Sequence, residues 1–234
     1  MTTIGLIGSG NIGSTVARLA VDAGYDVVLS NSRGPETLQD LVRDLGPRAR
    51  AATATEAAEA GDLVVVTVPL HAYREVPAAP LAGKTVIDTN NYYPERDGRI
   101  AALDDGSDTT SGLLQAHLPD AHVVKTFNNI FFVALAALAR PQGEDRSTLS
   151  VFGDDDGAKA EVTAFLDAIG YDALDVGPLA DSWRAENGRP AYVMPYATDG
   201  DVDAPSPAGA DVVRDLLARA DRSDVQPAAA APPS

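Results

Sequence analysis

Three glycines near the start of the chain, Gly8, Gly10 and Gly13, have the spacing G-x-G-x-x-G. This spacing suits a phosphorylated ligand: the first glycine permits a tight turn, the second lets the backbone approach phosphates, and the third lets a helix pack closely on the preceding strand. The helix N-terminus then offers N–H groups and partial positive charge to the anion. The turn therefore predicts a dinucleotide pyrophosphate site, with a plain glycine-rich turn as the alternative. The residues expected to form it are Gly8, Ser9, Gly10, Asn11, Ile12 and Gly13.

A second polar turn, Asn31-Ser32-Arg33-Gly34-Pro35, follows the predicted strand Asp26–Ser30. NAD sites usually have an acid near this point, which binds the ribose 2′-hydroxyl, but no acid ends this strand. The Arg33 guanidinium could pair bidentately with a 2′-phosphate, and the Ser32 hydroxyl could donate to it. We therefore expect NADP(H) rather than NAD(H), with a solvated loop arginine as the alternative.

The β-branched run 63–68 is typical of a central parallel strand that is buried on both faces. It leads into Val68, Pro69 and His71. Ligands of open α/β sheets bind at the carboxyl ends of the strands, so Val68 and Pro69 are expected to contact the cofactor. His71 is a candidate for positioning a ring or giving a proton, although a histidine here could also cap a helix or face solvent.

Two amides, Asn90 and Asn91, follow the predicted strand Thr85–Asp88. They offer neutral hydrogen bonds, which suit a carboxamide or the polar edge of a flavin-like ring. Asparagines are also ordinary turn residues, so a simple loop is the alternative.

The elements that must position these residues alternate between strand and helix patterns as far as residue 176. This alternation predicts an α/β fold with a doubly wound, mostly parallel sheet, a Rossmann NAD(P)-binding domain over residues 1–176. The further strands are expected at 48–52, His122–Lys125, 148–152 and 171–176, and the helices at 35–45, 55–60, 112–118, 130–138 and 158–169.

Beyond residue 176 the alternation stops, and residues 177–220 are expected to form a small, partly helical cap segment. The apolar, aromatic stretch 190–196 could close over the site or form the surface of a homodimer. A flexible linker is expected at 198–207 and an amphipathic helix at 208–220. The Pro/Ala-rich tail 221–234 is predicted to be disordered.

The chain has 234 residues, a net charge of −16 and no cysteine. The negative charge argues against nucleic acid or an anionic membrane as a partner, and no apolar run is long enough to span a bilayer. A cytoplasmic protein with a small-molecule substrate is expected. The acidic run Asp154-Asp155-Asp156 is expected to cap a helix rather than bind a metal.

The order of these motifs resembles the coenzyme F420-dependent NADP oxidoreductases, and it is similar to the reductase domain of the STEAP metalloreductases. Besides the two turns above, the residues that carry the resemblance are Val123-Val124-Lys125-Thr126-Phe127-Asn128, Gly153-Asp154-Asp155-Asp156, Asp175-Val176-Gly177-Pro178-Leu179 and, for the STEAP type, Asp88-Thr89-Asn90-Asn91 with Tyr93-Pro94-Glu95. The likeness covers about residues 3–187.

This resemblance implies an oxidoreductase in which NADP(H) and coenzyme F420, or a related flavin, lie ring against ring and exchange a hydride. The segment that contains Phe127, Asn128 and Asn129 would face the rings. Asn128 stands where the deazaflavin enzymes carry a histidine, so it and Asn129 are expected to position a ring rather than transfer a proton. No residue is assigned as a certain catalyst.

Two other functions fit the sequence. Lys125, Asn128 and Asn129 have the K-x-x-N-N spacing of the β-hydroxyacid dehydrogenases, whose lysine is catalytic. However, the glycine-rich segment before that lysine and the long helical domain are absent. A non-catalytic NADPH sensor that binds a partner through its aromatic tail is the second alternative.

Overall fold

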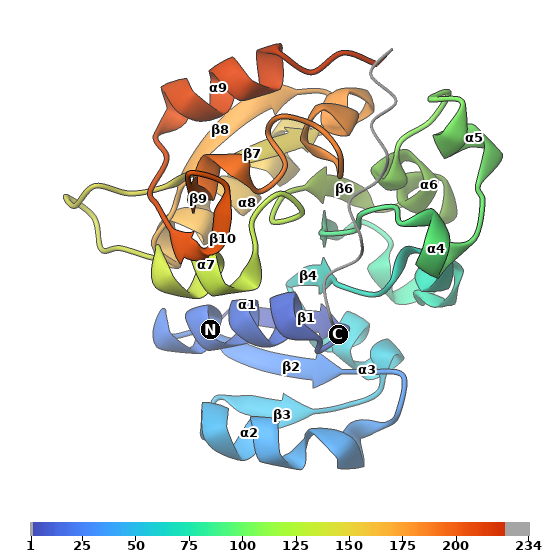
Figure 1. Ribbon diagram of the computed structural model, residues 1–234. Coiled ribbons are helices and arrows are strands. Elements are labelled where there is room, and N and C mark those ends of the chain that lie inside the picture. Colours follow the sequence, from blue (N-terminus) through green and yellow to red (C-terminus); the bar gives the residue numbers. More distant parts are fainter. Residues whose placement is uncertain (1, 223–234) are drawn as a thin grey trace.

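The computed structural model describes residues 2–222, and most of its strands form one eight-stranded sheet with the order β3-β2-β1-β4-β5-β6-β7-β8 (Figure 1). The strands are β1 (Thr3–Ile7), β2 (Asp26–Ser30), β3 (Ala49–Ala51), β4 (Leu63–Val66), β5 (Thr85–Asp88), β6 (His122–Lys125), β7 (Thr148–Gly153) and β8 (Asp172–Gly177). All neighbouring strands pair in parallel except β6 and β7, which pair antiparallel. The predicted doubly wound, mostly parallel Rossmann fold is confirmed.

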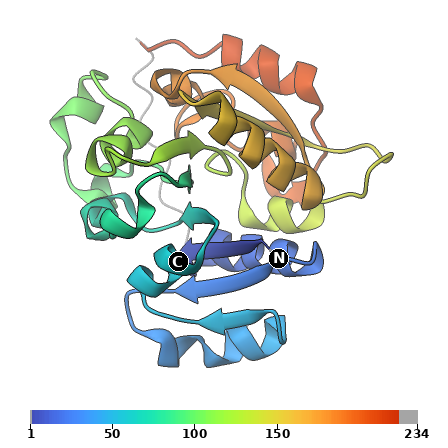
Figure 2. The same cartoon turned by 180° about the vertical axis from the view of Figure 1, so that it is seen from behind.

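Helices pack on both faces of this sheet, as the two opposite views show (Figures 1 and 2). The α-helices are α1 (Asn11–Asp22), α2 (Gln39–Leu45), α3 (Ala54–Ala60), α4 (Pro94–Asp97), α5 (Ala101–Asp104), α6 (Thr110–His117), α7 (Phe132–Ala137), α8 (Asp156–Ala168) and α9 (Ala210–Ala218). Shorter 3₁₀ turns are η1 (Pro35–Leu38), η2 (Leu70–Glu75), η3 (Ala79–Leu81), η4 (Leu179–Ala185) and η5 (Met194–Tyr196). None of the described helices is long and apolar enough to cross a membrane.

The core follows from the alternation of side chains along the central strands. In β4, Leu63 and Val65 belong to one buried cluster, while Val64 and Val66 belong to another. Because successive side chains of a strand point to opposite faces, an uninterrupted apolar run buries both faces of the sheet. This is the pattern that identified β4 from the sequence.

The C-terminal portion packs on the same core as the sheet. Ala191, Tyr196, Val213 and Leu217 are all buried in the larger cluster, together with residues of β1 and β2. The stretch 190–196 therefore lies largely inside the protein, which removes the exposed apolar surface on which the predicted homodimer rested. The homodimer itself stays a prediction.

The expected linker at 198–207 is wrong, because the chain forms a short antiparallel pair there, β9 (Ala197–Thr198) and β10 (Asp201–Pro205). Its turn contains Asp199 and Gly200, both with positive φ, of 51° and 81°. The acidic, proline-containing composition indicated a loop, whereas pairing between the two strands satisfies part of its backbone. The tail after residue 222 lies outside the described residues.

Several predicted boundaries shift by one or two residues. The helix expected at 35–45 is divided into η1 and α2, and the strand expected at 63–68 ends at Val66. Beyond Val66, the Thr67 amide still donates to the carbonyl of Ile7 at 2.8 Å, but the chain then turns away toward Pro69. The helix at 208–220 is confirmed as α9.

Candidate functional site at the carboxyl edge of the sheet

The glycine-rich turn connects β1 to α1 at the carboxyl edge of the parallel strands. Gly8 has φ of 108°, a conformation that side chains other than glycine rarely adopt, and its N–H donates to the Ser30 carbonyl at 3.1 Å. The Ser9 hydroxyl donates to the same carbonyl at 2.8 Å. The turn is thus fastened to the end of β2 by two bonds.

The start of α1 lies against the end of β4. A Cβ atom at Gly13 would lie 2.4 Å from the Gly8 carbonyl oxygen and 2.7 Å from the Thr67 hydroxyl oxygen, whereas a Cβ at Gly10 would meet nothing within 4 Å. The Thr67 hydroxyl donates to the Gly8 carbonyl at 2.9 Å. Gly13 is therefore required for packing, while Gly10, which is exposed, leaves its surroundings open for a ligand.

No side chain caps the N-terminus of α1, and its first turn contains no acid. Asn11 is exposed and Ile12 is half-buried at this end of the helix. A helix start that carries no acid and faces an open turn can accept an anion, because its first N–H groups have no partner within the helix.

The second turn follows β2 and is exposed at Ser32 and Arg33. The Arg33 N–H donates to the Asn31 side chain at 3.0 Å, while its guanidinium has no ion pair with any of residues 2–222. The Glu36 carboxylate lies beside Gly34, since a Cβ on that glycine would lie 2.5 Å from it. Sequence reasoning missed this acid, because it searched for one only at the strand end.

The segment after β4 places Val68 half-buried, Pro69 exposed and His71 in the first turn of η2. His71 Nδ1 lies 3.2 Å from Asp97 Oδ1, and the His71 backbone N–H donates to the same oxygen at 3.3 Å. Burial alone would raise the pKa of Asp97, but hydrogen bonds from the Arg96 guanidinium hold that pKa below its usual range. Asp97 is thus an ionised anchor for the His71 ring.

The segments after β5 and β6 meet through their amides. Asn91 Nδ2 donates to the Asn128 carbonyl at 2.7 Å, and Asn128 Nδ2 donates to Asn91 Oδ1 at 3.3 Å and to the Ala185 carbonyl at 2.8 Å. These bonds bring together residues that are 37 positions apart in the chain. The structure thus brings two of the predicted site residues, Asn91 and Asn128, into direct contact.

Several buried polar atoms at this edge have no hydrogen-bond partner. They are both side-chain atoms of Asn90, the Thr126 hydroxyl and Asn128 Oδ1. Asn90 is 3% exposed and Asn128 is 4% exposed. A buried polar atom without a partner costs about 1–3 kcal/mol, so this cluster is one that a polar ligand could complete.

The remaining predicted ring contacts point into the protein. Phe127 is fully buried in the core, and its ring packs edge-on against Phe165 with 6.5 Å between centroids. Asn129 Nδ2 donates to the Ala191 carbonyl at 3.1 Å. Any contact of Phe127 with a cofactor would therefore come from its backbone, and Asn129 holds the C-terminal portion.

Two tyrosines join this edge to the C-terminal portion. The hydroxyl oxygens of Tyr93 and Tyr192 lie 2.5 Å apart, and the Arg96 guanidinium stacks 4.7 Å from the centroid of the Tyr93 ring. Burial and the neighbouring Tyr192 hydroxyl raise the pKa of Tyr93, so both phenols are neutral at ordinary pH. The sequence drew attention to Tyr93 but gave no sign of its distant partner.

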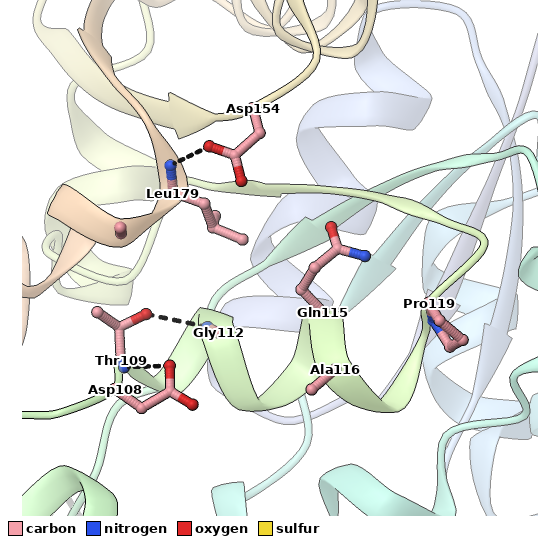
Figure 3. A pocket seen from close by; sticks show the side chains of 9 residues that line it. Asp108, Thr109, Gly112, Gln115, Ala116, Pro119, Asp154 and Leu179 are labelled. Carbon is pink, nitrogen blue, oxygen red and sulfur yellow. Dashed lines mark hydrogen bonds between the residues drawn. The ribbon is translucent and has the colours of Figure 1, made fainter.

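Two surface depressions lie away from the glycine-rich turn. One, of about 400 Å³, lies beside α6 and η4 and includes Asp108, Gln115 and Asp154 in its lining (Figure 3). The other, of about 370 Å³, lies near Arg48 at the edge strand β3. The side-chain NH₂ group of Gln115 donates to the carbonyls of Leu118 and Ala121, and its oxygen accepts the Val123 N–H. Both polar atoms of this side chain are therefore already hydrogen-bonded within the protein.

The acidic run after β7 lies at the opposite edge, because β7 is antiparallel to β6. Asp155 caps α8 by accepting the Ala158 N–H at 2.8 Å, and Asp154 accepts the Leu179 N–H at 2.9 Å. Asp156 pairs with Lys159. Each acid thus has a structural role, and no group of three metal-binding side chains occurs within residues 2–222.

Fold and glycine-rich turn together define a Rossmann-type, dinucleotide-binding protein. Residues 3–92 match the family described as NADP oxidoreductase coenzyme F420-dependent. The resemblance to that family is confirmed over this stretch. No curated protein matches the sequence significantly.

Solved structures extend the similarity to most of the chain. A hypothetical protein from Sinorhizobium meliloti is 28% identical, with a TM-score of 0.73, over 83% of this chain and 94% of that one. A proposed F420-dependent NADP reductase from Arthrobacter sp. FB24 is 26% identical, with a TM-score of 0.66, over 79% and 87%. The 3-hydroxyisobutyrate dehydrogenase of Mycobacterium tuberculosis, 18% identical with a TM-score of 0.55, shares the fold, but this chain covers 56% of it.

Proposed function

We propose that the protein is an NADP(H)-dependent oxidoreductase that transfers a hydride between NADP(H) and coenzyme F420 or a related flavin. The observation that carries this proposal is the cluster of unpartnered polar atoms on Asn90, Thr126 and Asn128, buried at the edge where the glycine-rich turn also lies. A nicotinamide carboxamide or the polar edge of a flavin would complete their hydrogen bonds.

The residues present fit NADP(H). The open turn at Gly10 and the uncapped start of α1 would receive the pyrophosphate. Ser32 and Arg33 would bind the 2′-phosphate, since the Arg33 guanidinium has no acid among residues 2–222 as a partner. Direct hydride transfer needs two rings that are held in contact and shielded from water. The buried amides and hydroxyl of the cluster would supply such an environment.

The first test replaces Arg33 with alanine. We expect NADPH affinity to fall about 10–100-fold, as the loss of a charge-assisted bond implies, while NADH affinity changes little. Arg214→Ala is the matched control, because Arg214 lies on α9, at the other end of the molecule from β2 (Figure 1). An equal loss for both nucleotides would remove the assignment of Arg33 to the 2′-phosphate.

The second test follows the nicotinamide absorbance when NADPH is mixed with the protein and coenzyme F420, FMN or FAD. Oxidation of NADPH by one of these acceptors is the expected result. Binding of NADPH without turnover would favour the sensor function, in which a partner protein binds the NADPH-loaded form.

We also propose that the protein is a cytoplasmic homodimer. Light scattering should then give twice the chain mass of 24.3 kDa.

A β-hydroxyacid dehydrogenase is less favoured by the geometry. Lys125 is fully buried, and its ammonium group lies among four oxygen-bearing partners of the protein. A catalytic lysine must reach its substrate. Oxidation of a 3-hydroxy acid with NADP⁺ as acceptor would nevertheless be the result that revives this function.

A further inference from the structure

Lys125 lies at the end of β6 and is buried with its charge. Its Nζ lies 2.6 Å from the Asn90 carbonyl, 2.5 Å from the Thr110 hydroxyl and 3.4 Å from Asp88 Oδ2, and Glu186 follows at 3.8 Å. A lysine ammonium group has three N–H donors. All three are engaged by the protein, so Lys125 has none left for a substrate.

The same network also forms hydrogen bonds with the backbone N–H and the backbone carbonyl of Asn90. Its N–H donates to Asp88 Oδ1 at 2.9 Å, and its carbonyl accepts from Lys125. The Thr110 hydroxyl, which accepts from Lys125, donates its own proton to Glu186 Oε1 at 2.8 Å. The other oxygen of Asp88 also accepts from the Ser111 hydroxyl at 2.5 Å. One buried ion pair, between Asp88 and Lys125, therefore fixes the peptide groups on either side of a single asparagine.

The side chain of Asn90 takes no part in this hydrogen-bond network. It is 3% exposed, and neither its Oδ1 nor its Nδ2 has a partner. Buried amides are almost always hydrogen-bonded. A rigid backbone that holds an unsatisfied amide at the carboxyl edge of β5 is suited to binding a group with a complementary donor and acceptor.

We infer that Lys125 is a positioning residue: together with Asp88 it fixes Asn90 so that the Asn90 amide receives the carboxamide of the nicotinamide. A carboxamide presents one carbonyl and one NH₂ group, which match the two unpartnered atoms of Asn90. The inference rests on the proposed function, because it requires NADP(H) at this edge. It assigns Lys125 a role in orienting a ring and none in proton transfer.

The test is a double-mutant cycle between Asn90→Ala and Lys125→Met. Two ligands are titrated by calorimetry: NADPH, and 2′,5′-ADP, which has the adenosine half but no nicotinamide. We expect each single variant to weaken NADPH about tenfold, the value of one or two hydrogen bonds, and the double variant to be no weaker than either. The affinity for 2′,5′-ADP should stay unchanged.

Other outcomes overturn the inference. Equal losses for NADPH and 2′,5′-ADP, or additive losses in the double variant, would mean that Lys125 only supports the fold. A wild-type protein that binds neither ligand would instead contradict the proposed function. The two failures are therefore distinguishable.

Lys125→Met leaves Asp88 buried without its cation and could prevent folding. Thr110→Val is the milder variant, since it removes one of the acceptors that hold the Lys125 ammonium group beside the Asn90 carbonyl. It should weaken NADPH about two- to fivefold and leave 2′,5′-ADP unaffected. Ser150→Ala, which also removes a buried hydroxyl but from a position on β7 that pairs with β8, is the control. A Thr110→Val protein that binds NADPH like the wild type would refute the positioning role.

Discussion

Phe127 shows how a single residue shapes the site. It has φ of 63°, although it is not a glycine, and this left-handed conformation costs roughly 1–2 kcal/mol. Its ring is fully buried against the core, which offsets that cost. The residues on either side, Thr126 and Asn128, each carry an unpartnered buried polar atom. The strained turn thus lies in the middle of the cluster that we assign to the ring, where such strain is commonly found.

The glycines of the turn give a matched pair of variants. Gly13→Ala should lower the free energy of unfolding by about 1–3 kcal/mol, because its Cβ would lie 2.4 Å from a backbone oxygen of Gly8. Gly10→Ala should leave stability unchanged, since nothing lies within 4 Å, yet weaken NADPH by tenfold or more by blocking the pyrophosphate. Urea unfolding and nucleotide titration measure the two effects. Normal NADPH binding by Gly10→Ala would show that the pyrophosphate lies elsewhere.

Residue types at the strand ends were accessible from the sequence, but the state of their atoms was not. Asn90 and Asn91 were both predicted to offer hydrogen bonds to a ligand. In the fold the Asn91 amide is engaged with Asn128, and the Asn90 amide has no partner. The Asn91 amide is engaged by a residue 37 positions away, and a local pattern does not contain such a contact.

At the scale of the element, α3 illustrates a helix whose start is fixed by local chemistry. Thr53 is its N-cap: its hydroxyl accepts the Glu56 N–H at 3.3 Å, and the Glu56 carboxylate accepts the Thr53 N–H at 2.9 Å. This reciprocal capping box satisfies two backbone donors at once. Hydrogen bonds from Thr53 also lower the pKa of Glu56.

Thr53→Ala should therefore lower the free energy of unfolding by about 1 kcal/mol. NADPH affinity should change little: although the cap follows β3 at the carboxyl edge, the Thr53 hydroxyl is engaged with Glu56 of the same helix. Thr163→Ala, an exposed position within α8, is the control and should stay within about 0.5 kcal/mol of the wild type. Equal unfolding midpoints for both variants would show that the capping box contributes nothing measurable.

Most elements could be predicted because their patterns are local. The runs of β1 and β4 are mostly apolar and short, and they lead into Gly8 and Pro69. The reversal at β7 could not be predicted, since the segment 148–152 has the same apolar character as a parallel strand. Its direction is set by α7 and the long connection after it, and by pairing with β6. The pair β9–β10 was missed because it contains few apolar residues.

At the scale of the whole molecule, buried tyrosine hydroxyls join distant elements. The Tyr196 hydroxyl donates to the Thr148 carbonyl at 2.7 Å, and the Tyr171 hydroxyl donates to the Leu135 carbonyl at 2.6 Å. The pair Tyr93 and Tyr192 joins the segment after β5 to the C-terminal portion. All three bonds lie between residues far apart in sequence, so the C-terminal portion and the sheet are expected to unfold together.

These tyrosines make stability sensitive to alkali. Burial raises the pKa of Tyr196 and of Tyr171 above the value of about 10 that a tyrosine has in an unfolded chain. The folded protein therefore retains protons that the unfolded chain releases, so the contribution to stability is complete below about pH 10 and is lost as the pH rises further.

Tyr196→Phe tests this coupling, because it keeps the ring and removes the hydroxyl. At pH 7 the variant should be less stable by about 1 kcal/mol, the value of the bond to Thr148. Above about pH 10 its stability should fall less steeply than that of the wild type, so the two curves converge. Urea unfolding between pH 7 and pH 11 measures both, with Thr163→Ala as a control whose curve runs parallel to the wild type. A constant difference between Tyr196→Phe and the wild type at every pH would show that this buried phenol does not govern the alkaline transition.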